Sequence, residues 1–192
     1  MKKSITVVFG AIAGGVLAQS TPAFSMENDT EKYSTVGFWE IRVDDSLGGG
    51  CFMLANYDGG AALRIGWKPK AEELYLIVAD EDWDSLQVEK KYDIEMKLGN
   101  EAPWNIDASG INVDGLKGLV ASVTDENFIS EFRNKNSIEF SWNKKPLATL
   151  SLKNSKKAFR QLQTCQSGVT DAPEKVKVSG SDAARSDDPF RE

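Results

Sequence analysis

The 192-residue chain contains no histidine and only two cysteines. Histidine is the usual base of nucleophilic triads and the commonest metal ligand, so its absence excludes Ser-His and Cys-His catalysis and His-bound metals. Two cysteines and scattered carboxylates make a tetrahedral zinc site improbable. The chain also lacks the glycine-rich turn from strand to helix that binds nucleotide phosphates. We therefore expect no cofactor and no metal, and we predict that the protein is not an enzyme.

The N-terminus has the pattern of a secretory signal. Lys2 and Lys3 precede an apolar run over residues 5–18, which is interrupted by glycines and is short for a bilayer span. Small residues then offer peptidase sites, so we expect residues 1–25 to be removed. The alternative is an uncleaved membrane anchor, although no charged stop-transfer flank follows. The pattern predicts a periplasmic or secreted protein with no membrane span in the mature chain.

Positive charge is in the minority and is scattered along the chain. The sequence holds 23 basic and 29 acidic residues, and cleavage would remove two lysines and no acid, which leaves a net charge of −8 (21 − 29). An acidic chain repels phosphate backbones and anionic lipid headgroups. We therefore expect the partner to be an unknown protein or envelope component, and not nucleic acid.

The two cysteines, Cys51 and Cys165, are expected to form a disulfide in an exported chain. The bond would close a long loop, for which chain entropy gives a stabilisation of about 4–5 kcal/mol as an upper figure. Two free buried thiols are the alternative. A redox-active pair is disfavoured because the C-x-x-C spacing is absent.

Alternating polarity recurs through the middle of the chain and predicts strands with one face on a core. Such strands are expected at residues 39–43, 63–67, 92–98 and 138–142. Residues 51–55 and 74–79 are apolar at every position, which is typical of central strands covered on both faces. Turn residues at Asp58–Gly60 and Asn143–Pro146 predict antiparallel hairpins.

Two segments show helical spacing. Thr124 can cap a helix that places Phe128 and Phe132 on one face. Asn154 or Ser155 can cap a second helix, whose apolar stripe includes the second cysteine. The disulfide would therefore fasten this last helix to the second strand of the fold.

Together these elements predict a mainly β (α+β) fold, either an antiparallel β-sandwich or a curved sheet of about eight or nine strands, with two short helices. We expect a single domain over residues 33–167. Residues 26–34 are polar and aperiodic, which indicates a flexible leader. Residues 168–192 hold too few apolar side chains to repay the entropy of ordering, so we predict a disordered C-terminal tail.

The stretch LATLSLKNS, from Leu147 to Ser155, is followed by Ala158, Phe159 and Leu162. This segment resembles the closing part of invasion-associated locus B-like secreted proteins, in which an aliphatic strand and a Ser-Leu-Lys step lead into a final helix. The chain is also similar to small exported alphaproteobacterial proteins in its arrangement, which has an early strand with Trp, a strand with Cys and a last helix that ends in Cys. The resemblance implies a periplasmic or secreted β domain that serves at the envelope or toward a host, and it assigns no catalytic residue.

Paired carboxylates can hydrolyse glycosides without histidine, with one as the acid and the other as base or nucleophile. The candidates are Glu40, Asp44, Asp45, Asp93, Glu95 and Glu139. Strand alternation directs most of them to outward polar faces, which disfavours a shared pocket. A carboxylate-dependent glycoside hydrolase is therefore an alternative function and not the main prediction.

The densest acidic cluster, Asp80–Asp84, has the spacing of the first ligands of a calcium loop. Ser85 and Lys91 stand where such a loop requires glycine and a bidentate glutamate, so we predict a solvated turn. Among the five tryptophans, Trp83 and Trp104 adjoin turn residues, whereas the other three lie on predicted core faces. The candidate ligand or partner surface comprises Asp82, Trp83, Asp84 and Trp104. We predict a non-enzymatic binding or envelope-associated protein, with a host-interaction factor as the alternative.

Overall fold

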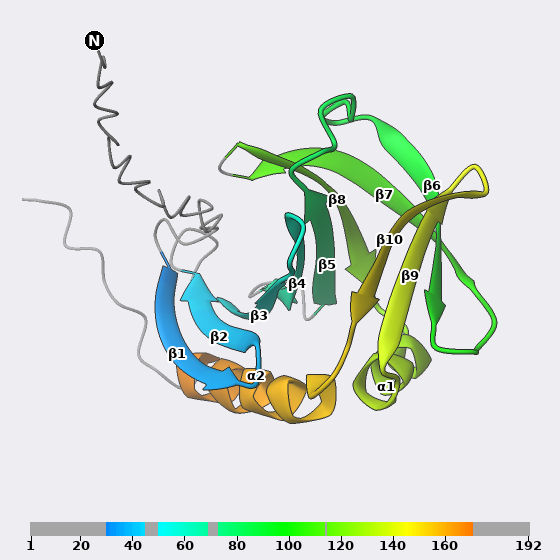
Figure 1. Ribbon diagram of the computed structural model, residues 1–192. Coiled ribbons are helices and arrows are strands. Elements are labelled where there is room, and N and C mark those ends of the chain that lie inside the picture. The colour runs from blue at the N-terminus through cyan, green and yellow to red at the C-terminus, as the bar shows by residue number, and fades with distance from the viewer. Residues whose placement is uncertain (1–29, 45–49, 69–72, 114, 171–192) are drawn as a thin grey trace, which may run out of the picture.

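The computed structural model describes residues 30–44, 50–68, 73–113 and 115–170. In this part of the chain ten strands form one antiparallel sheet, accompanied by two helices (Figure 1). The strands are β1 (Thr30–Val36), β2 (Trp39–Asp44), β3 (Gly50–Asn56), β4 (Ala61–Lys68), β5 (Glu73–Asp80), β6 (Lys91–Leu98), β7 (Trp104–Val113), β8 (Leu116–Val123), β9 (Ser137–Trp142) and β10 (Lys145–Ser151). The helices are α1 (Glu126–Asn134) and α2 (Ser155–Thr170). The mainly β fold with two helices is thus confirmed, as one curved sheet.

The strand order is β1-β2-β3-β4-β5-β8-β7-β6-β9-β10. The first five strands follow one another as antiparallel neighbours, and β6, β7 and β8 then run backward so that β8 pairs with β5. The sheet curls strongly, and both helices lie at one end of it (Figure 1). Where the curl brings β3 toward β10, the Tyr57 hydroxyl donates a hydrogen bond to the Ser151 carbonyl at 2.8 Å. The curved sheet therefore encloses most of the core itself.

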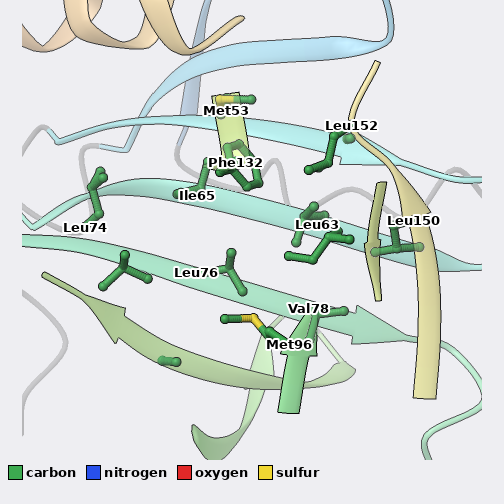
Figure 2. Packing of buried hydrophobic residues seen from close by; sticks show 14 of the residues in the cluster. Met53, Leu63, Ile65, Leu74, Leu76, Val78, Met96, Phe132, Leu150 and Leu152 are labelled. Carbon is green, nitrogen blue, oxygen red and sulfur yellow. The ribbon is translucent and has the colours of Figure 1, made fainter. Parts of the chain in front are cut away.

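The main core lies on the inner face of this curl. Figure 2 shows Met53, Leu63 and Leu76, from three adjacent strands, directed toward side chains that come much later in the chain. Leu150 and Phe132 belong to that later group, and each is at most 5% exposed. Since these contacts join distant segments, the core forms only when the whole sheet has closed.

The central strands are buried on both faces, as the continuous apolar runs predicted. Residues of β3 alternate between the inner core and a second apolar cluster on the outer face, which includes Phe52, Leu54 and Tyr75. Arg64 lies in this second layer and is 4% exposed. Its guanidinium donates to the Asp44 carboxylate at 2.5 Å and to the Tyr75 hydroxyl at 2.8 Å, and it stacks 3.6 Å from the Phe52 ring centroid. The buried charge is thereby paired and hydrogen-bonded.

Helix α1 begins one residue later than the sequence indicated. The N-cap is Asp125 and not Thr124, because the Asp125 carboxylate accepts a hydrogen bond from the Asn127 amide at 2.7 Å. A carboxylate is a stronger acceptor than a hydroxyl and is also favoured at the positive end of the helix dipole. The predicted buried face is confirmed, since Phe128 and Phe132 are at most 1% exposed.

Helix α2 begins at Ser155, directly after Asn154, whose backbone φ of 69° marks the change of direction from β10. The Asn154 carbonyl accepts hydrogen bonds from the Lys157 and Ala158 amides at 3.0 Å. The Ser155 hydroxyl donates to the Phe132 carbonyl at 3.0 Å, so it joins the two helices instead of capping its own.

The predicted disulfide is confirmed. Cys51 and Cys165 are bonded, with their Cα atoms 6.0 Å apart, and the Gln166 side chain accepts a hydrogen bond from the Cys51 amide at 2.9 Å. The bond fastens α2 to β3, which is the third strand and not the second. The difference arises because β1 occupies residues 30–36, so the interpretation of residues 30–34 as a flexible leader is wrong.

Two further predictions concern the ends of the chain. The predicted signal, residues 1–25, lies outside the described residues. So do residues 171–192 of the predicted tail, whereas residues 168–170 belong to α2. Neither helix of the described chain has the length and apolar character needed to cross a membrane.

Candidate binding site

The loop over residues 81–90 and the β9–β10 hairpin lie at the end of the sheet away from the helices (Figure 1). The loop is held against β7, because the Glu89 amide donates to the Gly110 carbonyl at 2.8 Å and the Gly110 amide donates to the Lys90 carbonyl at 2.9 Å. A Cβ atom at Gly110 would lie 2.1 Å from the Gln87 carbonyl oxygen. Glycine at this position therefore allows the loop to approach β7 closely.

A cavity of about 270 Å³ lies between this loop and the hairpin. We call it the aromatic pocket, and its lining residues are Asp82, Trp83, Ser85, Leu86, Gln87, Lys90, Tyr92, Ile94, Leu119, Trp142 and Leu147. The Tyr92 and Trp142 rings meet edge to face, with centroids 5.4 Å apart. The Tyr92 hydroxyl accepts a hydrogen bond from the Gln87 amide at 2.9 Å, which fixes the loop over the rings. The walls are thus mainly apolar, and the two charged residues among the lining, Asp82 and Lys90, are exposed.

The predicted surface residues divide between two places. Trp83 is half-buried in the aromatic pocket, and Asp82 and Asp84 are exposed beside it. Trp104 instead begins β7, where its indole N–H donates to the Glu131 carboxylate at 2.9 Å and its ring meets Phe128 edge-on. The structure therefore separates the two tryptophans that the sequence grouped.

The aromatic pocket brings Trp83 together with Trp142, which the sequence placed only on a core face. Trp142 is half-buried and is the last residue of β9, next to the turn at Asn143. That position beside a turn was the available signal for its role, since it is the feature that singled out Trp83. Tyr92 gave no such signal, because its alternation within β6 is that of an ordinary core residue.

A second cavity, of about 550 Å³, lies where the sheet splits between β7 and β8. β7 pairs with β6 from Trp104 to Ser109, but its register with β8 begins only at Ser109 opposite Val120. We call the gap between residues 104–108 of β7 and residues 121–123 of β8 the β7–β8 cleft. Its lining residues are Lys68, Lys91, Trp104, Asn105, Ile106, Asp107, Ser109, Val120, Ala121, Ser122, Val123, Thr124, Asp125 and Phe128.

The six carboxylates considered for glycoside hydrolysis are dispersed. Glu40 accepts from Lys32 at 2.6 Å and from Arg42 at 2.9 Å, and the Lys32 hydrogen bond is the largest cause that lowers the pKa of Glu40. Asp44 is paired with Arg64 in the outer layer. The remaining described candidates, Asp93, Glu95 and Glu139, are exposed, and Asp45 lies outside the described residues. None of the five described carboxylates lines either cavity.

The acidic turn at Asp80–Asp84 is held by side-chain hydrogen bonds to its backbone. The Asp80 carboxylate accepts from the Asp82 amide at 3.0 Å, and the Asp84 carbonyl accepts from the Lys117 ammonium group. Within the described ranges, no group of three or more Asp, Glu or Cys side chains is placed to hold a metal ion.

The chain is similar in structure to a protein of known structure. No protein-family model matches the sequence, and no curated protein matches it. Among solved structures, the crystal structure of invasion-associated protein B from Bartonella henselae superposes with a TM-score of 0.51 at 16% sequence identity. The two proteins share a fold. The alignment covers 72% of this chain and 98% of that chain, and it confirms the resemblance inferred from the closing segment.

Proposed function

We propose that the protein is an exported, non-enzymatic binding domain that takes a small apolar or ring-shaped group of its ligand into the aromatic pocket. The observation that carries this proposal is the convergence of Trp83, Tyr92 and Trp142 from three separate segments on one concave, mainly apolar cavity. Concave apolar sites with a few polar groups are where proteins usually bind small molecules. The volume is slightly below the usual range for such sites, which favours a single ring or a short chain.

Export and the absence of catalysis belong to the same proposal. The disulfide supports export, because such bonds persist in oxidising compartments. Binding is favoured over catalysis because the chain contains no histidine and because the pocket offers one carboxylate, Asp82, where a glycosidase needs two.

The test follows the indole N–H signals of the tryptophans by nuclear magnetic resonance, with each signal assigned from a Trp→Phe variant. The probes are indole, methyl β-glucoside, N-acetylglucosamine and octyl glucoside. We expect at least one probe to shift the Trp83 and Trp142 signals together, because both rings line the same cavity. The Trp104 signal is the internal control and should remain in place. If no probe moves the Trp83 and Trp142 signals, or if all five tryptophan signals move alike, the aromatic pocket is not the binding site.

A host-directed role is the second candidate, favoured by the fold shared with an invasion-associated protein. It predicts that deletion of the gene lowers entry into host cells while envelope integrity, measured by detergent sensitivity, is unchanged. Loss of envelope integrity with normal entry would instead support an envelope role. A chain carrying both Trp83→Ala and Trp142→Ala tests whether the aromatic pocket is responsible for this role. It should reproduce the phenotype of the deletion.

A further inference from the structure

The β7–β8 cleft exposes backbone on both of its sides. In an antiparallel sheet, successive residues direct their N–H and C=O groups to opposite neighbours. Gly110 bonds to the β6 side of β7, through the Lys90 carbonyl and the Glu89 amide. Ser109 therefore faces β8, and the alternation places the backbone groups of Asp107 and Asn105 toward the cleft.

The same alternation applies to β8. Val120 lies opposite Ser109 and so faces β7, which directs the backbone of Ser122 into the cleft from the other side. Residues 121–123 remain paired with β5 on their far side. Two unpaired strand edges thus face each other within one sheet, in the part of the chain that the structure describes. Such edges are templates for an added strand.

The side chains around the cleft differ between its two faces. The inner floor is apolar and consists of Trp104, Ile106, Ala121, Val123 and Phe128, all of which belong to the main core cluster or pack against it. The outer rim is polar, and the ammonium groups of Lys91 and Lys68 bond to the hydroxyls of Ser109 at 2.7 Å and Ser122 at 2.8 Å. An extended segment with apolar residues on one face and polar residues on the other matches this arrangement.

We infer that the β7–β8 cleft binds an extended peptide segment of another protein, which inserts as a strand between β7 and β8. The incoming backbone bonds to Asn105 and Asp107 on one side and to Ser122 on the other. Its alternate side chains point inward to the apolar floor and outward to the rim. The outer rim carries Asp107 as well as Lys91 and Lys68, so we expect polar outward side chains, with a carboxylate favoured beside Lys91 and disfavoured beside Asp107. This inference does not depend on the aromatic pocket.

The length of the site is set by the part of β7 that does not pair with β8. Residues 104–108 pair with β6 and lie outside the register with β8. Five residues at a rise of about 3.3 Å span about 17 Å, so the bound core of the peptide should be four to six residues long, as a rough estimate. Within it, an apolar residue at every second position is required for contact with Trp104 and Ile106, the half-buried residues of the floor.

The experiment selects a displayed library of random ten-residue peptides against the full chain and measures the selected peptides by calorimetric titration. The decisive variant is Asp107→Pro, because proline removes the backbone N–H that faces the cleft without removing a bond to β6. The matched control is Asp107→Ala, which changes the side chain but keeps that N–H. We expect peptides of alternating polarity, bound about tenfold more weakly by Asp107→Pro and less than about threefold more weakly by Asp107→Ala.

A second measurement uses the unaltered chain, so that the test does not depend on the folding of the proline variant. Because an inserted strand bonds along both of its edges, methylation of the peptide nitrogens on either edge should abolish binding. Loss at one edge only would mean that the peptide lies beside a single strand, and it would overturn insertion between β7 and β8. Loss at both edges supports insertion between β7 and β8. Selection of no peptide, or of peptides that bind equally after methylation and equally to Asp107→Pro, would overturn the inference.

Discussion

The two ends of the sheet are held in different ways. At the helical end, the disulfide joins α2 to β3, and the fully buried Trp39 donates its indole N–H to the Lys153 carbonyl at 3.0 Å. At the opposite end, the loop over residues 81–90 rests on backbone hydrogen bonds and on the half-buried ring of Trp83. We infer from this contrast that stability is concentrated around α2, whereas the end with the aromatic pocket is held without a covalent bond.

This division has a physical reason. A ligand pocket requires apolar surface that is not already covered, and such surface contributes little to folding. The covalent bond and the buried aromatic residues at the helical end compensate for that loss. If the division is correct, damage to the helical end lowers stability and leaves ligand binding intact, and damage to the pocket has the reverse effect.

The largest effect on stability is expected from removal of the disulfide. Cys51 and Cys165 are 114 residues apart, and the loop that they close constrains the unfolded chain strongly. Cys51→Ser combined with Cys165→Ser should lower the free energy of unfolding by about 4 kcal/mol, measured by urea denaturation. Reduction of the unaltered protein is the control and should give a similar loss. Equal midpoints for the bonded and unbonded chains would show that α2 is held by packing alone.

The next largest effect concerns the buried ion pair of the outer layer. Arg64→Met removes the guanidinium that pairs with the Asp44 carboxylate and donates to the Tyr75 hydroxyl, at a site where both side chains of the ion pair are 5% exposed. Breaking such a pair from one side costs about 3 kcal/mol or more. The matched control, Arg64→Met combined with Asp44→Leu, removes both charges and should recover a large part of the loss. An Arg64→Met variant as stable as the parent would mean that the ion pair of this outer layer contributes little to the stability of the sheet.

Alkaline pH should destabilise the folded chain through two buried tyrosines, Tyr75 in the outer layer and Tyr57 beside the main core. Burial raises the pKa of Tyr75 to about 12 and raises the pKa of Tyr57 as well, so both phenols stay neutral in the folded chain after they ionise in the unfolded chain. Above pH 10 the unfolded state therefore binds fewer protons, and stability falls by up to about 1.4 kcal/mol per pH unit for each group. Urea denaturation at pH 9, 10 and 11 measures this slope. Tyr75→Phe should make the slope shallower, and an unchanged slope would contradict the assignment.

Much of the fold could be predicted from the sequence because burial imposes clear patterns. The alternation at residues 92–98 and the continuous apolar run at residues 74–79 identified β6 and β5 directly. β1 could not be recognised in this way. It is an edge strand with mostly exposed side chains, and its pairing with β2 depends on the backbone and on polar contacts such as the bond from Arg42 to Thr30 at 2.8 Å.

The candidate sites were less predictable because they depend on which segments meet. Proximity to a turn identified Trp83, but the closing of the sheet decides that its neighbour is Trp142 and not Trp104. No strand was predicted from the sequence over residues 104–123, where β7 and β8 lie. The alternation of β8 is interrupted by Gly118, and Leu116 joins the outer cluster while Leu119 joins the inner core. Hydrophobic periodicity along the sequence therefore could not predict the split between β7 and β8.

The smallest effect on stability is expected at the pocket itself. Trp83→Ala removes a half-buried ring, whereas the bonds that shape the turn, from the Trp83 amide to the Asp80 carbonyl and from the Leu86 amide to the Trp83 carbonyl, are made by backbone and remain. We expect a loss of about 1 kcal/mol or less in the free energy of unfolding, together with a loss of at least about tenfold in affinity for any probe that binds in the pocket.

The matched comparison is Trp39→Phe, a smaller chemical change at the helical end. It removes the hydrogen bond to the Lys153 carbonyl and opens space beside Phe132, whose ring centroid lies 6.2 Å from that of Trp39. This variant should lose more stability than Trp83→Ala and should keep its affinity for the probe. Thermal unfolding measures the stability of each variant, and titration with the probe measures its affinity. If truncation of Trp83 destabilised the chain more than Trp39→Phe, the pocket would be a structural part of the core, and the division between a stable end and a binding end would be wrong.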